Sequence, residues 1–266
     1  MNKLSLALAL GTGLTLSLAA PSISRAAATK TTIQTLATPE LSASQFNTLF
    51  KPTNAPVLSS TVEFLNTPGA GALRSQVFQG TGAASGLYAY AYQLSVNNTT
   101  NNLGEPVHVD SASWQFNATP VGTDFANLGK PTYAYVVKDA AIGGFVPPGS
   151  PAGESIRIPS SLSWQAGNNV GAIRADYVDP NSGTQPLDAG NDGAAFVIVT
   201  KQPPSDKFQY AGVLSSNPQL GAPAVYTATS GDVSPVPVPE PATILAWAGM
   251  AGAVLLVRRV RKARVA

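Results

Sequence analysis

Apolar and polar residues alternate along several short segments of the chain, a pattern typical of half-buried β-strands. In the clearest segment, Leu87–Val96, one face carries the large residues Tyr88, Tyr90, Tyr92, Leu94 and Val96. The opposite face is small or polar and includes Ala89 and Ala91. Thr132–Lys138 repeats the alternation, and Ala194–Thr200 is apolar on both faces, as expected for a buried central strand.

Further β-prone runs are separated by clusters of Asn, Asp, Gly, Pro and Ser, which favour turns. We expect strands at Val57–Leu65, Leu73–Gln79, Val107–Phe116, Ser155–Ile158, Ser161–Gln165, Val170–Val178 and Phe208–Leu214. This pattern predicts a mostly β fold, an antiparallel β-sandwich-like domain, with two small sandwiches as the alternative. The pentapeptides SASWQ and SLSWQ resemble each other, and we interpret both as strands that place a tryptophan, Trp114 or Trp164, in one core.

One helix is expected near the start of this β-rich region. Thr38 is placed to cap it, and Pro39 suits its first turn. Phe46, Leu49 and Phe50 would then form an apolar stripe along one side.

The first residues have the layout of a secretory signal peptide. Lys3 supplies the basic start, Leu4–Ala20 is the apolar centre, and small residues at Ala26 and Ala28 mark the cleavage region. We therefore predict an N-terminal signal helix that is removed on export. An uncleaved N-terminal anchor is the alternative, which the cluster of small residues disfavours.

The end of the chain combines an apolar run with a basic tail. Ala242–Val257 is free of charged residues, and as a helix it would extend about 24 Å, close to a hydrocarbon core of about 30 Å. Arg258 and Arg259 open the basic tail, which the positive-inside rule keeps in the cytoplasm. We predict a single C-terminal transmembrane helix, with Arg258 and Arg259 as its stop-transfer residues and the preceding chain outside.

Pro239, Glu240 and Pro241 lie directly before this apolar run, behind a spacer in which proline alternates with valine. The order of tripeptide, short hydrophobic helix and paired arginines resembles the PEP-CTERM sorting signal of exported bacterial proteins. The same segment is also labelled an ice-binding-protein C-terminal domain, a label that implies no ice binding here. A eukaryotic GPI signal normally ends in its hydrophobic tail, and a Gram-positive wall-sorting signal needs a pentapeptide that this chain lacks.

The resemblance implies a route for the protein. Pro239, Glu240 and Pro241 would be the sorting motif recognised by an exosortase, a membrane cysteine protease-transpeptidase that removes the helix and tail. The secretion machinery and the membrane would be further partners, and an association with exopolysaccharide is implied by resemblance only. The protein would be anchored transiently in the inner membrane and then reach the cell surface or the extracellular matrix.

The resulting layout has five parts. They are a signal peptide (1–28), a β-rich exported domain (29–232), a Pro-rich spacer with the motif (233–241), a transmembrane helix (242–257) and a basic cytoplasmic tail (258–266). Between Thr29 and Pro239 the chain holds nine Lys/Arg and thirteen Asp/Glu, a net charge of −4. The basic excess therefore belongs to the two terminal segments, which argues against a nucleic-acid partner.

The chain offers few groups for catalysis or metal binding. Cysteine is absent, and His108, the single histidine, lies two residues from Asp110 on a predicted strand. A metal site or half of a catalytic triad is conceivable there, but an exposed strand histidine beside an acid is the preferred interpretation. Asp188–Gly193 suggests a calcium loop but departs from the EF-hand template, so an Asx-rich turn is preferred. We predict no cofactor and no metal.

The aromatic residues allow two interpretations. The tyrosine face of Leu87–Val96, with Trp114 and Trp164, would suit sugar stacking, but periodic aromatic residues in a strand are mostly core residues. We therefore expect a non-enzymatic exported protein. The alternatives are a carbohydrate-binding module or a secreted hydrolase that carries the same sorting signal.

Overall fold

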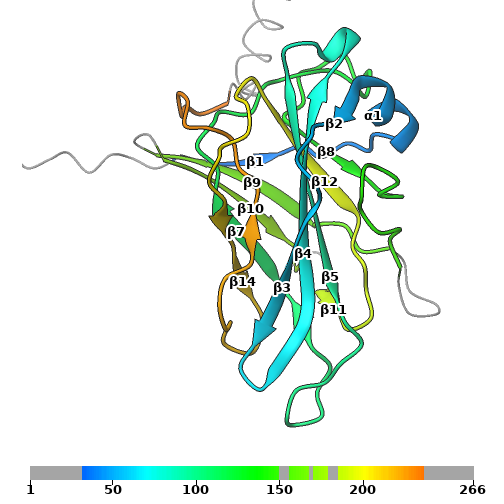
Figure 1. Cartoon of the computed structure of the whole chain (residues 1–266), viewed down its shortest axis with the longest axis vertical. Helices are drawn as coiled ribbons and strands as arrows, with labels where there is room; N and C mark the ends of the chain where they lie inside the picture. The colour runs from blue at the N-terminus through cyan, green and yellow to red at the C-terminus, as the bar shows by residue number, and fades with distance from the viewer. Residues whose placement is uncertain (1–31, 150–155, 168–169, 179–184, 237–266) are drawn as a thin grey trace, which may run out of the picture.

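The computed structural model of the chain describes residues 32–149, 156–167, 170–178 and 185–236 (Figure 1). The expected signal peptide, sorting motif, transmembrane helix and basic tail lie outside the described residues. Within the part of the chain that the structure describes, no helix is long and apolar enough to cross a membrane.

Sheet A is an antiparallel sheet with the order β1-β9-β10-β7-β14. Its strands are Thr32–Leu36 (β1), Ser161–Ala166 (β9), Gly171–Asp176 (β10), Ser111–Gln115 (β7) and Gly212–Leu214 (β14). Trp114 on β7 and Trp164 on β9 both lie opposite Ile173 on β10, and all three side chains are buried. The prediction that both pentapeptides place a tryptophan in one core is therefore confirmed.

Sheet B has the order β2-β4-β5-β12-β8, and β3 also pairs with the long strand β4. Its strands are Phe50–Pro52 (β2), Leu58–Phe64 (β3), Thr67–Gly80 (β4), Tyr88–Val96 (β5), Ala195–Thr200 (β12) and Ala134–Val137 (β8). All of the named pairs are antiparallel. The prediction of a mostly β fold with antiparallel sheets is confirmed.

Two short pairs and a 3-10 turn complete the described elements. They are His108–Val109 (β6) with Leu187–Asp188 (β11), Gln209–Tyr210 (β13) with Ala224–Val225 (β15), and Gly82–Ala84 (η1). The run that was expected to form one strand at Val107–Phe116 divides at Asp110, whose backbone bonds Leu214 and Tyr177. The strand expected at Ser155–Ile158 is not found in its described part, 156–158.

The expected helix exists but begins four residues later than predicted, so that α1 spans Ala43–Leu49. Ser42 caps it, because its hydroxyl accepts from the Gln45 N–H while the Gln45 side chain accepts from the Ser42 N–H. The residues before Ser42 pair with the edge of β8 instead: the Leu41 N–H donates to the Val136 carbonyl. This pairing prevents the predicted start at Thr38.

Sheets A and B form two layers (Figure 1), and the aromatic face of β5 lies in the core between them. The Tyr92 ring lies 4.4 Å from that of Trp114, and the Tyr90 ring lies 5.2 Å from that of Phe116, both distances between centroids. A second core covers the other face of sheet B, where Phe46 of α1 packs against Phe78 of β4. The strands β5, β12 and β8 of sheet B are thus buried on both faces, whereas the outer face of sheet A remains open.

Candidate functional site

The outer face of sheet A carries short polar side chains in register across its strands. Arg174 on β10 lies between Ser113 on β7 and Ser163 on β9. In the next row, Ala172 lies between Gln115 and Gln165 on the same two strands. Because side chains alternate along a strand, these residues point away from the core that holds the two tryptophans.

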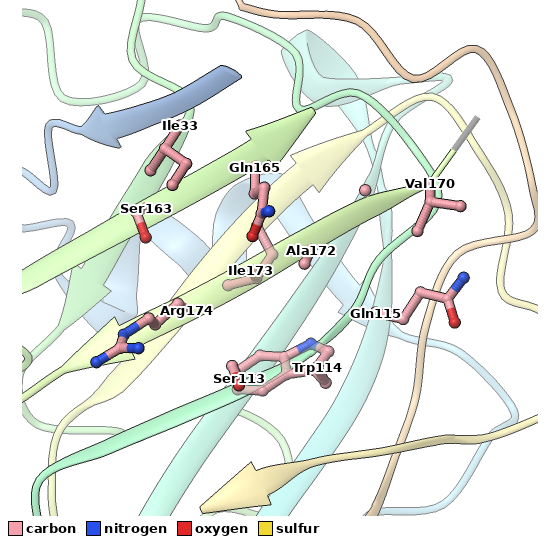
Figure 2. A pocket seen from close by; sticks show the side chains of 11 residues that line it. Ile33, Ser113, Trp114, Gln115, Ser163, Gln165, Val170, Ala172, Ile173 and Arg174 are labelled. Carbon is pink, nitrogen blue, oxygen red and sulfur yellow. The ribbon is translucent and has the colours of Figure 1, made fainter. Parts of the chain in front are cut away.

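A shallow hollow of about 460 Å³ lies over this face (Figure 2). It forms because the small side chain of Ala172 is flanked by the two longer glutamines, Gln115 and Gln165. Ile33 and Val170 also line the hollow and remain 68% and 51% exposed. We call this feature the sheet A hollow. It combines apolar surface with amide, hydroxyl and guanidinium groups.

The polar groups of the sheet A hollow are only partly satisfied by the protein. Gln115 Nε2 donates to Asn117 Oδ1 at 3.1 Å, and Arg174 Nε donates to Asp176 Oδ1 at 2.7 Å. Within the described part of the chain, no hydrogen-bond partner is found for the Gln165 amide or the Ser163 hydroxyl. The site therefore holds one oriented guanidinium and one anchored amide beside groups that are free to bind a ligand.

A second feature is the C-terminal strap, Asp232–Val236, which is held by side chains rather than by strand pairing. Gln34 Nε2 donates to the Val236 carbonyl and Gln34 Oε1 accepts from the Val236 N–H, both at 2.7 Å. Trp164 Nε1 donates to the Ser234 carbonyl at 3.0 Å, and the Thr119 hydroxyl bonds both Asp232 and Ser234.

The C-terminal strap joins the two ends of the described fold. Gln34 belongs to β1, the first strand, yet it holds the last described residue, Val236, which is 2% exposed. The last described residue before the predicted sorting motif is therefore buried against the domain. Only Pro237 and Val238 separate it from Pro239 in the sequence.

His108 and Asp110 approach each other as their spacing suggested, with His108 Nε2 3.5 Å from Asp110 Oδ1. Asp188 lies opposite His108 in the pairing of β11 with β6, and it forms an ion pair with Arg157. Among the described residues, no group of three or more His, Cys, Asp or Glu side chains is arranged to hold a metal ion. His108 lies on β6 and Asp110 follows that strand, and both side chains are partly exposed, which agrees with the preferred interpretation of a strand histidine beside an acid.

The segment Asp188–Gly193 forms a hydrogen-bonded turn. The Asn191 N–H donates to the Asp188 carbonyl at 3.1 Å, and Gly190 adopts a positive φ of 82°. Asp192 exchanges two backbone hydrogen bonds with Gly149. The backbone geometry is that of a tight loop, as the preferred turn interpretation predicted.

The aromatic residues proposed for sugar stacking lie in the core. Tyr90, Tyr92 and Trp164 are fully buried and Trp114 is almost so, so they offer no face to a ligand. Burial raises the pKa of Tyr92 and of Tyr90 far above the ordinary value of tyrosine, and neighbouring tyrosines add to the shift at Tyr90. The core interpretation of these residues is confirmed.

A smaller hollow of about 420 Å³ lies beside α1, lined by Thr48, Asp124 and Phe125 among others. The Asp124 carboxylate already accepts from the N–H groups of Leu128 and Gly129, at 2.6 and 2.9 Å. Its chief polar group is thus occupied by the loop itself, and we regard the sheet A hollow as the better candidate for a ligand site.

Apart from Trp114, which the sugar-stacking alternative included, no residue that lines the sheet A hollow was predicted to be functional, although the two similar pentapeptides carried a signal. In SASWQ and SLSWQ, each tryptophan is flanked by a serine and a glutamine that point the other way. The repeated Ser and Gln positions are those that line the hollow. The residues that were named as functional, Ala26, Ala28, Pro239, Glu240, Pro241, Arg258 and Arg259, lie outside the described residues.

Comparison of the chain with protein-family models, with curated proteins and with solved structures found no match.

Proposed function

We propose that this chain is a non-enzymatic exported protein of the cell surface or extracellular matrix. Its C-terminal signal directs it to an exosortase in the membrane, which removes the helix and the basic tail. The observation that carries this proposal is the ending of the chain, where Pro239-Glu240-Pro241, Ala242–Val257 and Arg258-Arg259 follow one another without interruption.

The remaining layout of the chain supports this route. A basic start, an apolar run and small residues at Ala26 and Ala28 precede the β-rich region, as in proteins that are exported with a cleaved signal peptide. The alternation of proline with valine before the motif disfavours a helix and favours an extended polyproline II strand. Such a strand is a suitable substrate for an enzyme that cuts near Pro239.

The proposal is tested by the C-terminus of the mature protein in the producing bacterium. Mass spectrometry of released protein is expected to find a C-terminus near the motif, without Trp247 and the arginines. Glu240→Ala, or deletion of the exosortase, is expected to leave a longer, membrane-bound form. Glu63→Ala is the matched control because Glu63 lies on β3, outside the motif. This variant should be processed like the native protein.

A plain membrane anchor predicts a different result. The apolar run and Arg258-Arg259 are sufficient for stop transfer, so Glu240→Ala would change nothing and the helix would be retained. An intact arginine tail on mature surface protein, in a host with an active exosortase, would refute the processing proposal. It would leave the predicted topology in place.

A further inference from the structure

We propose that the sheet A hollow binds a neutral glycan chain, with Ala172 at its floor and with Gln115, Gln165 and Arg174 bonding the sugar hydroxyls. The inference deepens the proposed function, on which it rests for the meeting of protein and glycan outside the cell. It assigns the ligand to an outer sheet face, not to the aromatic residues considered from the sequence.

The mixed lining of the hollow suits a sugar ring. Ligand sites commonly combine apolar surface with a few polar groups that fix orientation. Ala172 and the exposed side chains of Ile33 and Val170 supply apolar surface for the C–H groups of a sugar. The glutamines and serines around them supply donors and acceptors for its hydroxyls.

The free hydrogen-bonding capacity of the hollow matches groups that both donate and accept. The Gln165 amide offers two donors and an acceptor, none of them used by the described part of the protein. Gln115 uses Nε2 to bind Asn117, which holds the side chain in place and leaves Oε1 available. Because they lie two strands apart, about 9.6 Å, the two glutamines are spaced to contact sugar units two positions apart in one glycan chain.

The charge of the hollow favours a neutral ligand. Among the described residues that line it, Arg174 is the only basic one, and it is paired through Nε with Asp176, so the pair carries no net charge. Asp176 also orients the guanidinium and leaves its Nη groups for hydroxyl oxygens. The hollow therefore offers no excess positive charge to attract a glycan with many carboxylates or a nucleic acid.

Among the described residues of the hollow no aromatic ring is exposed, which sets the expected strength of binding. Trp114 contributes to its lining but is only 3% exposed, because its indole packs on Tyr92 in the core. Contacts to a single sugar are therefore weak. We expect affinity to increase from a trisaccharide to a hexasaccharide, since a longer chain also reaches Ile33 and Val170.

The test uses the full-length protein in a detergent without a sugar head group. Four neutral hexasaccharides, namely maltohexaose, cellohexaose, laminarihexaose and mannohexaose, are titrated by calorimetry and by ligand-observed NMR, with hexagalacturonate as the acidic comparison. At least one neutral probe is expected to bind. Gln165→Ala removes an amide from the hollow, and Ala172→Leu fills its floor. Each substitution should weaken binding about tenfold.

Gln79→Ala is the matched control, because Gln79 is an exposed strand glutamine on β4, outside the hollow, and its loss should not change binding. Thermal melting of each variant verifies that it is folded. Failure of all four neutral probes, or binding unchanged in both hollow variants, would overturn the proposal. Tighter, salt-sensitive binding of hexagalacturonate would overturn the neutral ligand class.

The result is independent of C-terminal processing. If the tail is retained in the cell and the protein still binds a neutral glycan, the sorting proposal is refuted and the proposed site stands. A processed protein that binds no neutral glycan would refute the site and leave the sorting proposal intact.

Discussion

Replacing Gln34 with alanine removes the amide that holds the C-terminal strap at Val236. In the native protein this amide makes two hydrogen bonds of 2.7 Å, one to the Val236 N–H and one from its own Nε2 to the Val236 carbonyl. After Gln34→Ala both backbone groups lose their partners in a partly buried place. We expect the strap to detach at Val236 rather than the whole domain to unfold, because this segment is at the end of the described fold.

The size of the effect follows from these contacts. Each hydrogen bond contributes about 1 kcal/mol net, so the loss of two lowers the free energy of opening by about 2 kcal/mol. Val236 is 2% exposed, and its release would give up a further ~1.5 kcal/mol of apolar burial. This burial is common to both proteins, so it adds to the free energy of opening in each and leaves the difference of about 2 kcal/mol unchanged.

Hydrogen exchange of the Val236 amide measures this opening directly. A loss of about 2 kcal/mol corresponds to roughly thirtyfold faster exchange, while amides of the central strand β5 should change little. Gln79→Ala serves as the control, since its side chain has no hydrogen bond within the described part of the chain. If the Val236 amide is equally protected from exchange in Gln34→Ala, the claim that Gln34 holds the C-terminal strap in place is refuted.

Two further predictions concern buried tyrosines. Tyr92→Phe should destabilise the protein by about 1–2 kcal/mol, because the Tyr92 hydroxyl donates to the Tyr226 carbonyl at 2.9 Å. Tyr177→Phe should be neutral or stabilising, since no partner for the Tyr177 hydroxyl is found among the described residues. Urea unfolding measures both, and an equal loss in the two variants would contradict this distinction. Burial raises the folded-state pKa of Tyr90, Tyr92 and Tyr177, so stability should be constant below the unfolded pKa of about 10 and decrease above it, by up to ~1.4 kcal/mol per pH unit for each tyrosine. A free energy of unfolding that stays constant up to pH 11 would show that these hydroxyls ionise in the folded protein.

The sequence alone was sufficient to predict the strands with strong period-2 alternation. In Leu87–Val96, large residues on one face and small ones on the other leave only a strand between two packed layers as a suitable environment. The structure agrees, since Tyr90 faces sheet A while Ala89 and Ala91 lie in the second core beneath α1. Local pattern was decisive here because both faces are buried.

Tertiary contacts determined the elements whose local pattern is weak. The strand β1, TIQTL, alternates mostly polar residues and is a strand because it pairs with β9, about 130 residues later in the chain. Similarly, α1 is capped by Ser42 and not by Thr38 because the residues before Ser42 pair with β8. No local preference specifies either partner.

The sheet A hollow and the C-terminal strap also required the tertiary structure. The sequence places Gln115 and Gln165 in similar pentapeptides, but only the position of β10 between them brings the small Ala172 into the gap. Likewise, Gln34 and Val236 are separated by 202 positions, and only the tertiary fold, which also holds the strap at Trp164 and Thr119, brings them within hydrogen-bond distance. Periodicity determines which face of a strand is buried, whereas the order of strands in a sheet determines which exposed side chains become neighbours.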